Sequence, residues 1–165
     1  MSARLQTSGS TAADLERSWA VLVDWAGQAR WIPLTTLEVL SPHDAGLGVR
    51  IAALSGFRLG GLPVGLLDNF VVTGWSPPAG GHAELEVLHL GPWFTGEGVF
   101  HLSADGGGTR VDCVELVTVP GGAPTGALVG LALPAMTAAF RVSLAQFAAV
   151  AEGRRGLPAA RGARR

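Results

Sequence analysis

The chain has 165 residues, of which 48 % are hydrophobic and 15 % are charged, so it can bury its own core and is not a largely disordered protein. Its formal net charge is −1, but five of its twelve arginines lie in the last thirteen residues, which leaves seven arginines against thirteen acidic residues in the rest. This excess of acidic residues outside the tail argues against a nucleic-acid-binding protein, whose groove needs basic residues to bind phosphates. We predict one domain over 1–152 and a disordered basic tail over 153–165.

Three features predict a cytoplasmic protein without stable membrane insertion. Cys113 is the only cysteine, so no internal disulfide can form, as is usual in a reducing compartment. The N-terminus lacks the charged and apolar regions of a secretory signal. The most apolar stretch, 127–140, is too short to cross a bilayer and better suits a buried helix.

The N-terminal part predicts a short strand at about 3–9 and then two helices. Thr11 and Asp14 have the spacing of a capping box, and apolar residues follow at helical spacing, which predicts a helix over 12–23. A second short helix is expected over 25–31. Pro33 ends it, because the residue before a proline avoids the helical region.

From Leu34 the pattern changes to short β-like runs separated by turns rich in Gly and Pro, which predicts six strands in an antiparallel meander. After Pro124 the helical period returns over about seven turns, with Pro134 expected to kink the helix. Only this last helix is long and apolar enough to cover the apolar face of the sheet, so the fold class is α+β. The apolar stripe of the helix consists of Val129, Leu133, Met136, Phe140, Leu144, Phe147 and Ala151.

This order of elements, together with particular residues over about 12–150, resembles the START-like helix-grip superfamily in its bacterial polyketide cyclase/dehydrase and lipid-transport (SRPBCC) branch. The resemblance implies a curved antiparallel sheet of six to seven strands wrapped around the C-terminal helix, with a cavity between them. Members include lipid carriers, aromatase/cyclases and hormone receptors, and no shared catalytic motif maps onto this chain. The residues that carry the resemblance are Trp19, Asp24-Trp25, Trp31 to Thr35, Asp68, Val72-Thr73, Trp75 to Pro78 and Gly107 to Val111 running to Glu115.

Pairing the strands across two hairpins predicts which side chains face this cavity. Placing Ala104 opposite Thr109 puts Gly98 opposite Glu115, and a turn near Gly91-Pro92 puts His89 opposite Phe94. Both hairpins give the same inner face, with Glu84, Glu86, Glu97, His101, Arg110 and Asp112 outside. Leu66 is also expected inside. The predicted ligand-binding residues are Asp68, Phe70, Val72, Leu85, Val87, His89, Phe94, Gly96, Gly98, Phe100, Cys113 and Glu115, with Met136 and Phe140 from the helix.

The inner face has three polar side chains, which are the candidate catalytic residues. Asp68, expected opposite His89, could fix its tautomer as an acid/base pair, or the two could be a cross-strand ion pair. Glu115 could be a general acid or a hydrogen-bonding group for a ligand, or it could be neutralised by Arg141. Roughly 16 Å of predicted separation keeps Glu115 from acting with His89. The two inward glycines indicate either space for a ligand or tight packing against the helix.

No other chemistry is indicated. The spacing of His, Cys and acidic residues suits no zinc site, Cys113 has no activating neighbour, and no nucleophile elbow occurs. The glycine-rich segment 56–63 lacks the order and the helix of a dinucleotide site, and is either a mobile lid or a plain hairpin loop. We therefore expect neither a metal nor a cofactor. His101 and Asp112 are expected to form a structural pair on the outer face.

The apolar inner face with two glycine gaps predicts a carrier or sensor of a small apolar or aromatic molecule, lipid-like or polyketide-like. The alternative is a polyketide cyclase or dehydratase that uses His89 or Glu115 as acid or base. A second alternative, from the high hydrophobicity, is a non-catalytic partner-binding module.

Overall fold

Seven strands precede one long helix in the structure, a computed structural model that describes residues 2–59 and 62–154, without the side chains of 57–63 and 122–132. The predicted N-terminal strand is confirmed and is longer than expected. The elements are β1 (Ser2–Thr11), α1 (Leu15–Leu22), the 3-10 helix η1 (Ala26–Arg30), β2 (Thr35–Val39), β3 (Arg50–Leu59), β4 (Leu62–Ala79), β5 (His82–Pro92), β6 (Thr95–Asp105), β7 (Gly108–Thr118) and α2 (Gly122–Ala151).

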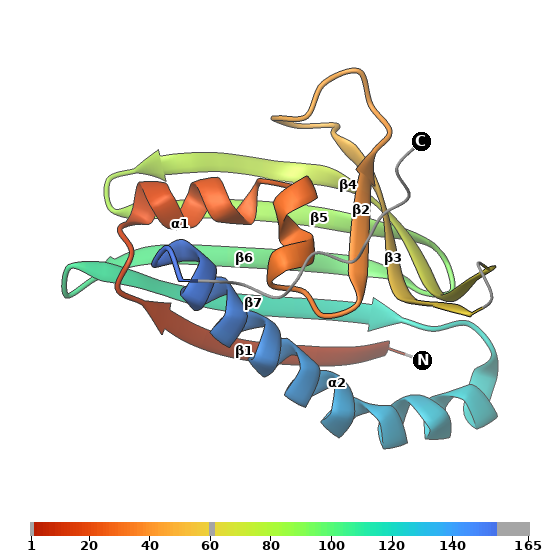
Figure 1. Cartoon of the computed structure of the whole chain (residues 1–165). Coiled ribbons are helices and arrows are strands. Elements are labelled where there is room, and N and C mark those ends of the chain that lie inside the picture. Colours follow the sequence, from red (N-terminus) through yellow and green to blue (C-terminus); the bar gives the residue numbers. More distant parts are fainter. Residues whose placement is uncertain (1, 60–61, 155–165) are drawn as a thin grey trace.

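All seven strands form one antiparallel sheet in the order β1-β7-β6-β5-β4-β3-β2 (Figure 1). Consecutive strands from β2 to β7 are neighbours, as in the predicted meander, and β1 is added beside β7 at the edge. The sheet is curved, and α1, η1 and the last turns of α2 pack on its concave face (Figure 1). The predicted α+β fold class is confirmed.

The start of α1 differs from the predicted capping box. Asp14, rather than Thr11, is the N-cap residue, and its carboxylate accepts a hydrogen bond from the backbone N–H of Arg17. The hydroxyl of Thr11 lies at the end of β1, where it accepts a bond from the N–H of Ala13. Both side chains are short acceptors with the correct spacing, so only the path of the chain after β1 decides which one caps the helix.

The core fills one end of the concave face. Trp19 of α1 packs edge-on against Trp75 of β4, with ring centroids 5.1 Å apart. Trp31, just after η1, packs edge-on against Phe147 of α2, with centroids 5.3 Å apart. These aromatic pairs lie near the end of the sheet that carries the β4–β5 and β6–β7 turns, because α1 and the last turns of α2 lie there (Figure 1).

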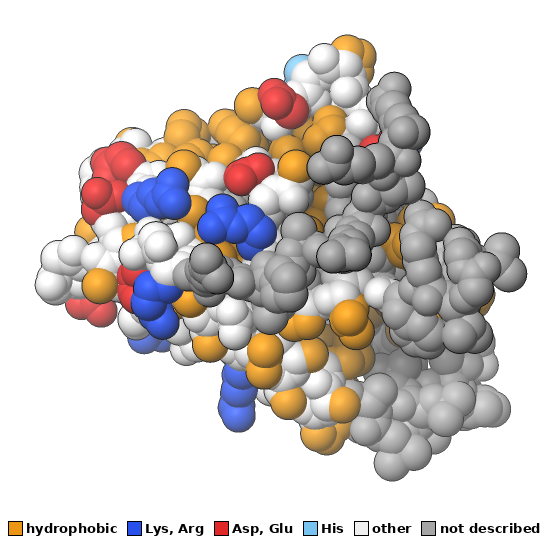
Figure 2. Space-filling model, viewed as in Figure 1, with side chains coloured by type: hydrophobic (Ala, Val, Ile, Leu, Met, Phe, Trp, Pro, Cys, Tyr) orange, Lys and Arg blue, Asp and Glu red, His pale blue; other side chains and the backbone are white. Residues whose placement is uncertain are grey.

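Helix α2 packs through its second half. Leu144 and Phe147 are buried, whereas Met136 and Phe140 are half-buried, and Val142 is 49 % exposed. The helix mainly contacts the edge strand β1, and apolar side chains reach the surface over its middle part (Figure 2). The prediction that 127–140 is buried is therefore wrong for its described part, 133–140.

Part of this helix is also the one candidate membrane span among the described residues. By length and composition alone, Leu133–Ala151 is long and apolar enough to cross a membrane, although a core helix would meet the same criterion. The burial of its last two turns against the sheet supports the core assignment for that part.

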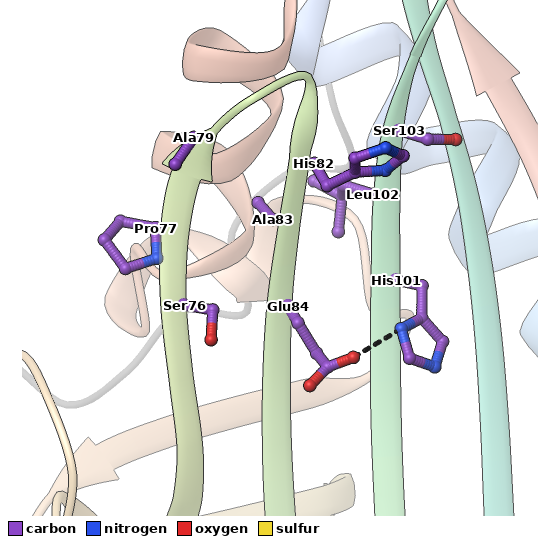
Figure 3. Close-up of a pocket in the computed structure, with 9 residues that line it drawn as sticks. All are labelled: Ser76, Pro77, Ala79, His82, Ala83, Glu84, His101, Leu102 and Ser103. Atoms are coloured by element: carbon purple, nitrogen blue, oxygen red, sulfur yellow. Dashed lines mark ion pairs between the residues drawn. The ribbon is translucent and has the colours of Figure 1, made fainter.

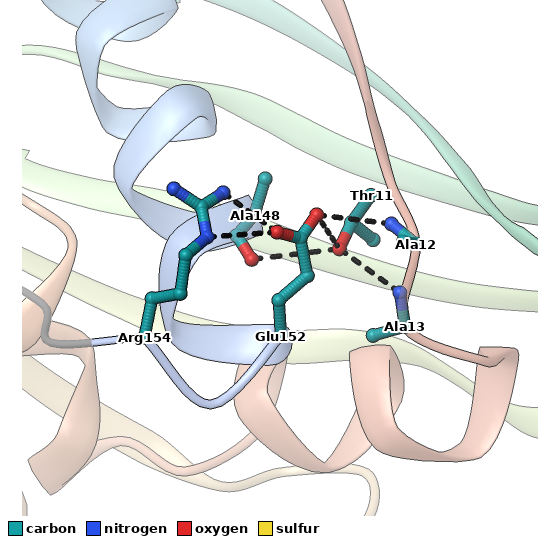
Figure 4. Close-up of polar contacts among 6 residues, drawn as sticks. All are labelled: Thr11, Ala12, Ala13, Ala148, Glu152 and Arg154. Atoms are coloured by element: carbon teal, nitrogen blue, oxygen red, sulfur yellow. Dashed lines mark hydrogen bonds and ion pairs between the residues drawn. The ribbon is translucent and has the colours of Figure 1, made fainter.

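Glu152 joins the end of α2 to the β1–α1 connection (Figure 4). Its Oε1 accepts hydrogen bonds from the N–H of Ala12 at 3.0 Å and from the hydroxyl of Thr11 at 3.1 Å, and its Oε2 accepts from the guanidinium of Arg154. Together these contacts lower the pKa of Glu152, the N–H of Ala12 contributing most. Arg154 is thus bound to the domain, two residues into the predicted tail, and the remainder of that tail lies outside the described residues.

We predict that Glu152→Gln lowers the melting temperature of the protein by a few degrees at pH 7, because the charged acceptor is lost from a site where it receives four hydrogen bonds. A carboxyl group whose pKa is lowered by folding stabilises the fold at pH values above its ordinary pKa, which is about 4.3 for glutamate. This stabilisation is lost as the pH falls below that value. Thermal unfolding from pH 3 to pH 7 measures both. Glu38→Gln, at an exposed position on β2, is the control and should leave the melting temperature unchanged. An equal decrease in both variants would show that Glu152 does not stabilise the contact between α2 and the β1–α1 connection.

Candidate functional site

The burial patterns of β5, β6 and β7 follow the predicted inner face, although one predicted register is wrong. Gly98 pairs with Glu115 and Phe100 with Cys113, as predicted, but His89 pairs with Gly96 rather than with Phe94. The β5–β6 turn takes two more residues than expected, and Phe94 lies in it. A shift of two residues leaves every side chain on its own face, which is why the inner set survives the error.

This register brings together the three polar side chains that the sequence predicted on the inner face. His89 Nδ1 lies 2.8 Å from Asp68 Oδ2, and His89 Nε2 lies 3.1 Å from Glu115 Oε2. The prediction that Glu115 is too far from His89 to act with it is therefore wrong. The corrected register separates the two Cα atoms by about 12 Å, two strands and two residues, which two long side chains can bridge. We call these three residues the polar cluster.

Asp68 also reaches His89 by an unexpected path. The residue opposite His89 is Phe70, not Asp68, which pairs with Pro92, and the register between β4 and β5 shifts at Asn69–Phe70. The Asp68 carboxylate therefore approaches the imidazole diagonally. The predicted contact exists, although the predicted pairing that motivated it is wrong.

Glycines allow the polar cluster to form across β6. A Cβ atom at Gly98 would lie 2.8 Å from both carboxylate oxygens of Glu115, so a side chain there would displace this carboxylate. At Gly96, which has φ +150°, a Cβ atom would overlap the carbonyl oxygen of Leu116. The space over Gly98 is thus occupied by the Glu115 carboxylate, and not by a ligand or by the last helix, the two alternatives that the sequence suggested.

His89 is protonated at neutral pH. Burial by itself disfavours the imidazolium, but hydrogen bonds and attraction from Asp68 and Glu115 outweigh burial and raise the pKa of His89 to about 9. With both ring nitrogens bound to carboxylates, the imidazolium has no free N–H for a substrate. Burial, and then the charge of Glu115, also raises the pKa of the Cys113 thiol, so Cys113 is not a nucleophile at neutral pH.

The stability of the protein should fall with rising pH because of His89. A pKa raised from 6.5 to about 9 stabilises the fold fully below pH 6.5, and this contribution is lost as the pH rises through about 9. At about 1.4 kcal/mol for each pKa unit, the loss amounts to roughly 3.5 kcal/mol at most. Urea unfolding between pH 6.5 and 8.5 measures most of it, and ionisation of the Cys113 thiol in the unfolded chain, with an ordinary pKa of 9.0, adds only a small further loss near pH 8.5. A stability that stays constant over this range would show that the imidazolium is not held by the carboxylates.

Two aromatic rings lie near the imidazole. The ring centroid of Phe70 lies 5.8 Å from that of His89, and the centroid of Phe94 lies 5.3 Å away. Val87 is buried next to them on β5. The polar cluster therefore has apolar surroundings, near the end of the sheet that carries the β3–β4 hairpin and the β5–β6 turn.

The other predicted ligand-binding residues are spread over the inner face. Val72 and Leu85 are buried in the core, against α1 and its neighbours, and Phe100 packs against the same cluster. Cys113 is buried, whereas Met136 and Phe140 are half-buried on α2. Only part of the predicted set therefore surrounds the polar cluster.

Several secondary predictions have definite outcomes. Leu66, expected inside, is 43 % exposed, since β4 extends past β5 at this end and pairs there with β3 alone. Residues 56–59 and 62–65 are paired strands of a hairpin, whose tip lies outside the described residues. Arg141, which the sequence suggested as a partner of Glu115, is exposed. Glu115 binds His89 instead.

The outer-face pair is also different from the prediction. His101 does pair in register with Asp112, but its imidazole contacts Glu84 at 2.6 Å, while Asp112 binds Arg110. The sequence found the partner of His101 on β7 and missed Glu84, which lies directly opposite His101 on β5.

Two open hollows among the described residues lie away from the polar cluster. One, of about 580 Å³, is lined by His82, Glu84 and His101 with neighbouring serines (Figure 3). The other lies by the β6–β7 turn and Asp14. Neither is lined by any of the three cluster residues. Within the part of the chain that the structure describes, no group of three His, Cys, Asp or Glu side chains could hold a metal ion.

Comparisons with known proteins identify the fold alone. No protein-family model and no curated protein sequence matches the chain. A protein from Thermus thermophilus is similar in structure, with a TM-score of 0.71 and 18 % identity over 92 % of this chain and 98 % of the other. A hypothetical protein from Helicobacter pylori has a TM-score of 0.69 and 11 % identity over 90 % and 88 %.

A third similar structure has a described activity. The Zhui aromatase/cyclase from Streptomyces sp. R1128 has a TM-score of 0.63 and 16 % identity, over 92 % of this chain and 94 % of the other. With the sheet order and the C-terminal helix, these likenesses confirm the helix-grip fold that the sequence resemblance predicted.

Proposed function

We propose that the protein binds a small apolar or aromatic molecule, lipid-like or polyketide-like, on the concave face beside the polar cluster, as a carrier or sensor. The observation that carries the proposal is the burial of Asp68, His89 and Glu115 beside the rings of Phe70 and Phe94, near the end of the sheet that carries the β5–β6 turn. A mostly apolar surface with a few placed polar groups is typical of small-molecule sites.

The fold supports the same proposal. One protein of the same fold is described as an aromatase/cyclase, which favours an aromatic or polyketide-like ligand for this chain too. Half-burial of Met136 and Phe140 leaves the middle of α2 less tightly packed than its last turns, so a ligand could lie between it and the sheet. Exposed apolar side chains surround this end of the sheet, where a ligand would reach the site: Leu66, Leu67, Leu90 and Trp93.

Catalysis by His89 is the second candidate, and its geometry is less favourable. A general acid must present its proton to the substrate, but both ring nitrogens of His89 already bind carboxylates. Glu115 and Asp68 each have one oxygen that does not bind His89, so either carboxyl group could act if a substrate lay beside it. A Glu115→Gln variant that retains full turnover of polyketide-like substrates would remove this candidate.

Titration with Nile red, a neutral apolar dye, tests the proposed binding. We expect saturable binding at one dye per chain, and about a tenfold loss of affinity in Phe94→Ala, because a half-buried ring beside the site is removed. Leu116→Ala, an exposed position on the outer face of β7, is the matched control and should bind as the wild type does. Binding that does not saturate, or equal losses in both variants, would contradict the proposal.

A further inference from the structure

The polar cluster has one more acidic group than basic groups. Two carboxyl groups, Asp68 and Glu115, face the single imidazolium of His89. Within the part of the chain that the structure describes, neither carboxylate forms an ion pair with an arginine. With both carboxylates ionised, the cluster has a net charge of −1, in surroundings where a charge is poorly solvated.

One oxygen of this cluster has no hydrogen-bond partner. Asp68 Oδ2 binds His89, whereas Asp68 Oδ1 is buried and has no partner among the described residues. A buried carboxylate oxygen without a donor is costly, so native structures usually supply one. His89 cannot supply it, because Glu115 occupies its second nitrogen. The missing donor must therefore come from outside the cluster.

The charge and the missing donor indicate the same kind of ligand. We propose that the protein binds an apolar organic amine as its ammonium ion, with the nitrogen at the Asp68 carboxylate and the apolar part against Phe70 and Phe94. This inference rests on the proposed function and names its ligand class. An ammonium group is a donor and also brings the charge of the site to zero, so it satisfies both observations at once.

Other polar head groups satisfy fewer of these conditions. A hydroxyl group donates a hydrogen bond to Asp68 but leaves the negative charge uncompensated. A carboxylate offers no proton to donate and adds a third negative charge beside Asp68 and Glu115, which is repulsive at short range in poorly solvated surroundings. The expected order of affinity is therefore amine, alcohol and then acid, for molecules with the same apolar part.

Three matched naphthalene compounds test this order on the full chain at pH 7: 2-naphthylmethylamine, 2-naphthalenemethanol and 2-naphthoate. Isothermal titration calorimetry should give an affinity for the amine at least about tenfold above that for the alcohol, and a weaker affinity for the acid than for the alcohol. In Asp68→Asn the amine should lose about tenfold, while the alcohol changes by less than about threefold, because the amide is neutral and nearly isosteric.

The outcomes separate the inference from the proposed function. If the alcohol and the acid bind as tightly as the amine, the ammonium class is wrong and apolar ligand binding stands. If none of the three binds, both are wrong. If Asp68→Asn does not fold, judged by circular dichroism, the order of the three affinities in the wild type decides alone. An Asp68→Asn protein that folds and keeps the preference for the amine would also overturn the inference.

Discussion

Replacing His89 by glutamine should lower the free energy of unfolding at pH 7 by about 3–5 kcal/mol. The substitution removes the imidazolium that lies between the carboxylates of Asp68 and Glu115, whose side chains are only 15 % and 9 % exposed. Removing one partner of a buried ionic group leaves uncompensated charge, and that is costlier than replacing the whole group. Glutamine can donate to one carboxylate at most and carries no charge. Urea unfolding monitored by tryptophan fluorescence measures the loss.

The chain provides a matched control on the opposite face of the sheet. His101 contacts the carboxylate of Glu84 at 2.6 Å, but the side chains are 55 % and 36 % exposed. His101→Gln should therefore cost less than about 1 kcal/mol, as is usual for exposed ion pairs. The triple variant Asp68→Asn, His89→Gln, Glu115→Gln should recover part of the loss, since no charge is left unpaired. Equal costs at His89 and His101 would show that the polar cluster is open to solvent.

The second large effect is expected at Phe147. Its ring is 2 % exposed and packs edge-on against Trp31, so it joins the last turns of α2 to the segment after η1. Phe147→Ala should lower the free energy of unfolding by about 3–5 kcal/mol, because it removes an aromatic side chain from a closely packed core. Thermal and urea unfolding both measure this loss.

Phe140→Ala is the control for Phe147, two turns earlier on the same helix. Its side chain is half-buried, so the same truncation should cost less than about 2 kcal/mol. A cost equal to that of Phe147→Ala would mean that α2 is packed with equal density along its length. That result would also weaken the proposal that a ligand lies beneath the middle of this helix.

His89→Gln and Phe147→Ala probe opposite ends of the concave face of the sheet. At one end, Trp19 of α1, Trp31 just after η1 and the last turns of α2 pack together. Toward the other end, the polar cluster lies among phenylalanine rings, and the middle of α2 is half-buried. The two ends are not separate, because Phe70 beside the polar cluster belongs to the core and its ring centroid lies 6.1 Å from that of Trp25.

The sequence by itself determined the elements and their faces. Alternation of side chains has a period of two along a strand, so the pattern places Glu115 and His89 on one face whatever the register is. Turn residues and the helical stripe likewise predicted the meander and the closing helix. These signals are local, and each can be read from a few consecutive residues.

Only the tertiary structure decided which of these residues meet. The length of the β5–β6 turn moved His89 by two residues relative to β6 and brought Glu115 within 3.1 Å, where the sequence had predicted roughly 16 Å. The path of the chain after β1 assigned the helix cap to Asp14 and freed Thr11 to bind Glu152. Register and loop path depend on the packing of distant segments, which no local pattern contains.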